Sequence, residues 1–156
     1  MNIFFYLIIF AIGVLFGSFY TLAVYRIPRK EDIIHTHSYC PNCNAKLGFF
    51  ELIPVLSYIF LGGKCKHCGQ KIRIRYLVLE LLSGTLFVLF ALILGLDVYN
   101  LDVNSLINFG FLALFATFII LTVSIYKEHK KLEKGVLIYG IIVTIMYMVY
   151  LYVLKK

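Results

Sequence analysis

Hydrophobic residues run in four long blocks along the chain, and polar residues gather between the blocks. The blocks cover residues 3–25, 76–96, 105–126 and 135–154, and each is nearly free of charge. A helix rises 1.5 Å per residue, so about 20 apolar residues cross the hydrocarbon core of a bilayer. The pattern predicts four transmembrane helices, and we expect the first to be retained rather than cleaved as a signal peptide.

Charged residues give these helices a direction. Nine of the 15 Lys and Arg residues lie at positions 26–75 and four more at 127–134, whereas the connection at 96–104 holds two aspartates and no basic residue. Basic loops stay on the cytoplasmic side, which predicts an outside N-terminus and places both basic loops inside. In this topology Lys155 and Lys156 fall on the outer side, which disagrees with the positive-inside rule. We therefore divide the chain into three parts: transmembrane helix 1 at 1–26, a cytoplasmic loop domain at 27–75 and transmembrane helices 2–4 at 76–156.

Composition agrees with a membrane location. Hydrophobic residues make up 62% of the 156 residues, mean hydropathy is +0.90 and only 15% of residues are charged, well outside the soluble range. The net charge of +7 is explained by topology and by attraction to anionic lipid headgroups, so no nucleic-acid partner is expected.

The loop domain contains every cysteine of the chain, in two Cys-x-x-Cys pairs separated by 21 residues. The predicted metal ligands are Cys40, Cys43, Cys65 and Cys68. This spacing is typical of a tetrahedral structural zinc site, and Pro41 and Gly69 favour the turns that it needs. The fold class expected is therefore an all-α integral membrane protein with about four transmembrane helices and a small cytoplasmic zinc-knuckle loop domain.

Two alternatives exist for the cysteines, a disulfide and a redox-active pair. A reducing cytoplasm disfavours persistent disulfides, so zinc is preferred. With four thiolates available, His35, His37 and His67 are interpreted as solvated or supporting groups.

Between the cysteine pairs, residues 52–60 show helical spacing, with Pro54 in the first turn and Gly62 as a stop signal. This segment is too short to cross a membrane. We expect it either in the membrane interface or as the loop's own core helix.

Two features of the spans also stand out. Gly13 and Gly17 form a Gly-x-x-x-Gly pair, which allows close helix packing within the bundle or between two copies. Glu80 lies about one turn into the second span, where a carboxylate needs a partner or water. Arg26 at the end of the first span is the candidate partner.

Five motifs resemble the N-terminal half of the bifunctional prepilin leader peptidases. They are residues 17–28 (GSFYTLAVYRIP), 38–43 (SYCPNC), 51–58 (ELIPVLSY), 62–68 (GGKCKHC) and 75–84 (RYLVLELLSG). The resemblance implies a bacterial membrane enzyme that cuts type IV prepilins or type II secretion pseudopilins and methylates the new N-terminus with S-adenosylmethionine. It covers residues 11 to about 90 and extends loosely through the last two spans.

The resemblance separates the two activities. The zinc loop is associated with methyl transfer, and the matching polar positions make Glu51 and Glu80 candidate catalytic residues and Gly63 and Arg75 candidate cofactor- or substrate-binding residues. Such an enzyme must deprotonate an ammonium with a pKa near 8, and a carboxylate can attract that group.

The peptidase of the family needs two aspartates, one following a span and one in a Gly-x-Gly-Asp motif. Where the resemblance places the first aspartate, residues 124–129 read SIYKEH. Tyr126 takes the position of that aspartate, and Glu128 is the nearest acid. The sequence contains no Gly-x-Gly-Asp motif. Because an aspartyl mechanism needs both carboxylates, we expect no prepilin cleavage by this polypeptide alone.

Three hypotheses follow. The first is a stand-alone or split methylating enzyme, in the second case completed by a separate aspartyl peptidase chain; the second is a non-catalytic scaffold that binds prepilins or pilus-assembly proteins; the third is a truncated product of a longer gene. The expected partners are prepilins or pseudopilins, membrane lipid, and either a separate aspartyl peptidase chain or a second copy of this chain.

Overall fold

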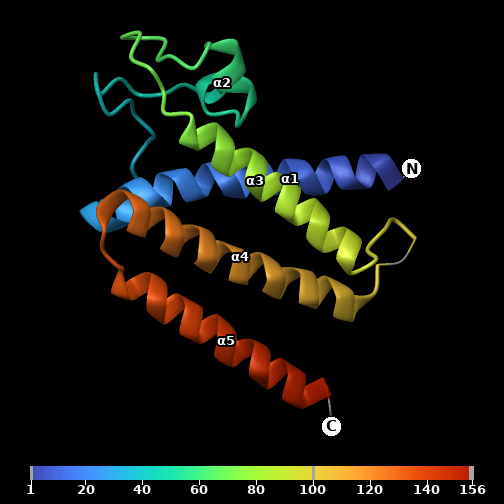
Figure 1. Ribbon diagram of the computed structural model, residues 1–156. Helices are drawn as coiled ribbons and strands as arrows, with labels where there is room; N and C mark the ends of the chain where they lie inside the picture. The colour runs from blue at the N-terminus through green and yellow to red at the C-terminus, as the bar shows by residue number, and fades with distance from the viewer. Residues whose placement is uncertain (1, 100, 155–156) are drawn as a thin grey trace.

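Four long helices form an antiparallel bundle, with a loop domain attached at one end (Figure 1). The computed structural model describes residues 2–99 and 101–154. The long helices are α1 (Asn2–Arg26), α3 (Arg75–Ile93), α4 (Val103–His129) and α5 (Lys134–Leu154). The loop domain holds the short helix α2 (Leu56–Phe60) and the 3-10 turns η1 (Ile27–Arg29) and η2 (Phe49–Glu51). All four long helices have the length and hydropathy of membrane spans, which confirms the expected fold class.

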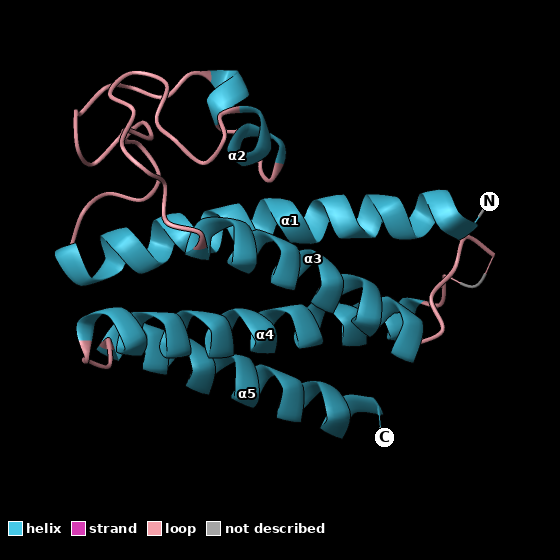
Figure 2. Cartoon of the chain, turned by 45° about the horizontal axis from the view of Figure 1, so that its top comes forward, coloured by secondary structure: helices cyan, strands magenta, loops and turns pink. Residues whose placement is uncertain are grey.

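The ends of the bundle differ in what they carry. The beginning of α1, residues 94–99 and 101–102, and the end of α5 lie at one end, whereas the loop domain and the 130–133 connection lie at the other (Figure 2). Two buried clusters hold the helices together. One joins Tyr20 and Val24 of α1 to Leu79 of α3 and Ile125 of α4, and the other is formed around Phe87 and Ala91 of α3.

Glycines determine how closely α1 and α3 approach. A Cβ atom on Gly13 would lie 2.7 Å from the backbone oxygen of Ser83, and one on Gly17 would lie 2.6 Å from the Cα of Glu80. Gly84 is equally close to the side chains of Phe10 and Val14. The Gly-x-x-x-Gly pair therefore serves helix packing within one chain, since only hydrogen atoms fit at these positions.

The short helix differs from the sequence prediction in length and in setting. It covers Leu56–Phe60 only, and Pro54 precedes it. The reason lies at Val55, whose φ of +63° is left-handed and cannot continue a helix. None of the five residues of α2, all of them described, is buried. Of the two expected settings, the one that makes this helix the core of the loop domain is therefore wrong.

The α1–α3 contact can be tested with a glycine pair. Gly17→Ala places a methyl group against the α3 backbone, and we expect a loss of about 1–3 kcal/mol of unfolding free energy. Gly110→Ala in α4 is the control, because apart from its chain neighbours and its own helix backbone no atom lies within 4 Å of its Cβ position, and alanine favours a helix. SDS-induced unfolding in mixed micelles, followed by circular dichroism, measures both. Equal stability of the two variants would contradict the close contact.

Candidate functional site

Each cysteine pair lies in a small hairpin, and the two hairpins repeat the same hydrogen bonds. In the first, Tyr39 and Lys46 form an antiparallel bridge, and in the second Lys64 and Lys71 do so. The N–H of the first cysteine donates to a carbonyl five residues on, over 3.0 Å in one hairpin and 2.8 Å in the other. The residue after the second cysteine has a left-handed φ in both hairpins, supplied by Asn44 (+56°) and Gly69 (+70°). In each hairpin the first cysteine is buried and the second is exposed.

The hairpins bring all four sulfur atoms into one cluster. The Sγ atoms of Cys40, Cys43, Cys65 and Cys68 lie within 4.8 Å of one another. The Sγ atoms of Cys40 and Cys68 are 3.9 Å apart, close to the spacing that tetrahedral Zn–S bonds of about 2.3 Å give. The cluster can hold a metal ion, and its all-sulfur donor set fits zinc.

The surroundings of Cys68 favour the ligand form of its sulfur. The backbone N–H of Gln70 and the side-chain amide of Asn42, which donates over 3.5 Å, lower the pKa of this thiol to about 6. The thiolate is the form that binds metal. Asn42 and Asn44 were not singled out from the sequence, although asparagine's tolerance of left-handed backbone was the available signal for Asn44.

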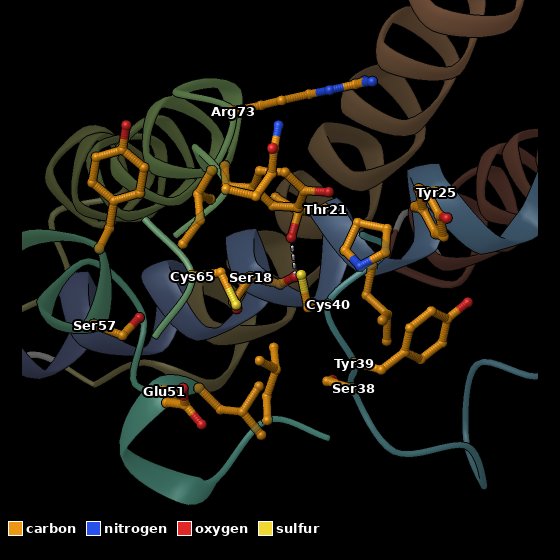
Figure 3. A pocket seen from close by; sticks show the side chains of 18 of the residues that line it. Ser18, Thr21, Tyr25, Ser38, Tyr39, Cys40, Glu51, Ser57, Cys65 and Arg73 are labelled. Atoms are coloured by element: carbon orange, nitrogen blue, oxygen red, sulfur yellow. Dashed lines mark hydrogen bonds between the residues drawn. The ribbon is translucent and has the colours of Figure 1, made fainter. Parts of the chain in front are cut away.

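A cavity of about 510 Å³ lies between the cysteine cluster and the bundle. Its lining comes from the end of α1, both hairpins, the segment around α2 and the start of α3 (Figure 3). Among the lining residues are Ser18 and Thr21 of α1, Cys40, Glu51, Cys65 and Glu80. The structure therefore brings both candidate acids and two of the metal ligands to one mixed polar and apolar hollow, which is typical of a small-molecule site.

The two acids have different surroundings. Glu80 is buried, with 7% of its surface exposed, and accepts a 2.8 Å hydrogen bond from the N–H of Val55. Glu51 accepts from the N–H of Gly48 over 2.7 Å and lies 3.5 Å from Nε2 of His67. The Gly48 N–H and the His67 ring hold the pKa of Glu51 below its usual value despite partial burial, so Glu51 is ionised at neutral pH.

Gly63 and Arg75 are described but lie outside the lining of this cavity. Gly63 is buried with φ +66°, donates its N–H to the carbonyl of Tyr58, and would place a Cβ 3.0 Å from the Tyr58 ring. Because Tyr58 lines the cavity and Gly63 packs against the Tyr58 ring, Gly63 supports the cavity wall without lining the cavity itself.

Arg26 does not pair with Glu80, and the sequence hypothesis of that ion pair is wrong for these two described residues. The Arg26 guanidinium instead donates to the backbone carbonyls of Asp32, Thr36 and His37 over 2.8–2.9 Å. Three carbonyls of the loop satisfy the buried cation, so the loop entry is fixed to the end of α1.

An ion cluster that the sequence did not indicate fixes the loop exit. The Glu128 carboxylate at the end of α4 pairs with Arg73, over 2.9 Å, and with Arg75. Its side chain is 14% exposed. No periodicity relates positions 55 residues apart, so only the folded chain shows this contact. The ion pair with Glu128 thus gives Arg75, a candidate binding residue, a partner within the protein.

The family model described as Bacterial Peptidase A24 N-terminal domain matches residues 11–94. The chain belongs to this family. The match contains the cysteine cluster, both cavity acids and the α1–α3 contact, so the A24 N-terminal domain is the unit that builds the site.

The chain is also similar to proteins that are named for two activities. The chain is 33% identical over 145 residues to a prepilin leader peptidase/N-methyltransferase of Vibrio cholerae, covering 87% of this chain and 53% of that protein. Proteins of the same name from Bacillus subtilis and Myxococcus xanthus are 46% identical over 80 residues and 39% over 79, each covering 51% of this chain and 32% or 24% of theirs. The chain thus spans about half the length of the Vibrio cholerae relative and less of the others. No solved structure matches it.

Metal content tests the A24 cluster. We expect about one zinc ion per chain by elemental analysis of detergent-purified protein, and its loss in Cys65→Ser because a closed tetrahedral site needs all four thiolates. His67→Ala is the control, since His67 faces Glu51 rather than joining the sulfur cluster. Loss of zinc in both variants would contradict a four-cysteine site.

The glycine pair at 62–63 tests the cavity wall. Both residues have left-handed φ values, but only Gly63 lies against Tyr58. We therefore expect Gly63→Ala to open the loop to limited proteolysis about tenfold faster than Gly62→Ala, an effect of about 1.4 kcal/mol. Similar cleavage rates would show that backbone strain alone, and not the Tyr58 contact, governs this turn.

Proposed function

We propose that this protein carries the N-methyltransferase half of prepilin processing, acting on the N-terminus of a type IV pilin or pseudopilin. The observation that carries the proposal is the cavity beneath the cysteine cluster, with Glu51 and Glu80 in its walls. The names of the relatives support the reaction, because they pair peptidase with N-methyltransferase activity. In this proposal zinc occupies the cluster as a structural ion and holds the cavity's outer wall in place.

The chemistry of N-methylation matches acids in a confined site. S-Adenosylmethionine supplies the methyl group when bound. The acceptor amine must enter the reaction unprotonated, and its ordinary pKa near 8 leaves most of it as ammonium at pH 7. Glu51, ionised at neutral pH, attracts and orients the ammonium group. The buried Glu80, which already accepts the Val55 N–H, is placed to accept a proton inside the cavity.

We place the loop domain on the cytoplasmic side of the inner membrane. The basic residues at positions 26–75 and 127–134 lie at the same end of the bundle, as the positive-inside pattern requires. Arg73 lines the cavity beside this surface and adds positive charge for an acidic group on a substrate.

In this proposal the residues of this sequence do not carry out the peptidase step. Tyr126 and Glu128 occupy the region where the first aspartate is expected. Glu128 is already paired with two arginines, so its carboxylate is not free to activate water. We propose that a separate aspartyl peptidase chain supplies this step, and that the two act on one prepilin.

A methylation assay tests the proposal. Purified protein in nanodiscs, given a mature pilin N-terminal peptide and labelled S-adenosylmethionine, should transfer label to the amine. Glu80→Gln should lower kcat about 100-fold, since proton transfer contributes typically 10²–10⁴-fold. Tyr99→Phe, at the opposite end of the bundle, is the control.

The same assay includes an uncleaved prepilin, whose mass should not change. Absence of label from a zinc-loaded, folded protein would overturn the methyltransferase proposal and leave the scaffold. A shortened prepilin would overturn the assignment of the peptidase to another chain.

A further inference from the structure

The segment at residues 49–61, here called the apolar segment, exposes six large hydrophobic side chains. The exposed fractions are 78% for Phe49, 79% for Phe50, 60% for Ile59 and 83% for Phe60, and Leu52 and Leu56 are also exposed. Outside membrane spans, exposed apolar patches of this kind mark surfaces that bind another protein or a membrane.

Charge along the apolar segment is restricted to one residue. Glu51 is the single charged side chain in residues 47–63, and it faces inward, 12% exposed, toward Gly48 and His67. Lys46 and Lys64 border the uncharged stretch on either side. An apolar surface bordered by lysines is the composition of segments that lie in a membrane interface.

The depth of the apolar segment follows from its contact with the bundle. The Val55 N–H donates to the Glu80 carboxylate over 2.8 Å, and Glu80 packs directly against Gly17. At 1.5 Å per residue, Glu80 lies about 7 Å from the start of α3 and Gly17 about 13 Å from the end of α1. Both views place α2 beside α1 rather than beyond its end (Figures 1 and 2).

The neighbouring surface at this depth is also apolar. Leu15, Phe16 and Phe19 of α1, on the turns around Gly17, are 47–59% exposed. A spanning helix presents such side chains to lipid. The exposed phenylalanines of the apolar segment therefore lie level with lipid-facing residues of the same bundle.

We propose that the apolar segment inserts into the leaflet next to the zinc loop and that lipid acyl chains cover its phenylalanines. The inference goes beyond the proposed function and does not depend on methyl transfer. Insertion makes one wall of the cavity part of the membrane surface, because Leu52, Ser57 and Tyr58 of the segment line it. A membrane-anchored substrate then reaches the cavity along the bilayer, without leaving it.

The chain contains no tryptophan, which allows single-tryptophan fluorescence to test the proposal. Phe60→Trp and, separately, Phe49→Trp are reconstituted in phosphatidylcholine–phosphatidylglycerol vesicles with and without brominated acyl chains. We expect bromine to lower the emission of both at least about twofold, as for side chains at the acyl boundary. Ile34→Trp is the matched control, because Ile34 is 83% exposed and lies in the polar part of the loop beside Asp32.

The result that supports insertion is strong quenching at positions 49 and 60 with little at 34. Equal, weak bromine quenching at all three positions, with quenching by aqueous iodide, would overturn it and place the segment in water. Protection from both quenchers would overturn it in favour of a protein partner or a second copy. If one variant fails to fold, the other still decides.

Discussion

The loop domain depends on its sulfur cluster because it has almost no other interior. Between positions 31 and 78, a stretch that the structure describes throughout, the buried residues are Cys40, Gly63 and Cys65. Hydrophobic burial, which stabilises ordinary domains, therefore contributes little here. The hairpins are joined across 21 intervening residues by thiol groups that a divalent ion would hold together. Metal binding and folding of such a loop are coupled, since the ligand geometry does not exist in the unfolded chain.

The bundle contributes the opposite wall through a second constraint, the close approach of α1 and α3. Gly17 lets the α3 backbone come close enough for Glu80 to lie between the helices and the loop. Its carboxylate then accepts the N–H of Val55, a β-branched residue in a left-handed conformation that is costly without such support. Packing between two spanning helices thus helps to determine the shape of the adjoining cavity. Substitution of Gly13 or Gly17 should therefore disturb the cavity, although neither glycine lines it.

Sequence reasoning succeeded where the signal is local or periodic. The four spans follow from block hydropathy, the cysteine cluster from its spacing, and the glycine contact from a Gly-x-x-x-Gly pair. It failed where the partner is distant and polar. Arg26 was assigned to Glu80 but binds three loop carbonyls, and the pairing of Glu128 with Arg73 and Arg75 has no sequence pattern. The short helix was predicted too long because helix periodicity does not register a single left-handed residue such as Val55.

Glu128 is an acid that the fold uses for ion pairing at the end of α4. Its carboxylate lies at the cytoplasmic end proposed for α4, close to the sequence position where the peptidase aspartate is expected, but two guanidinium groups already occupy it. A paired aspartyl mechanism needs one carboxylate to bind water and the other to hold a proton, and a carboxylate between two cations does neither. The same pairing holds Arg73 at the cavity. The acid therefore helps to hold one part of the wall of the proposed methyl-transfer site.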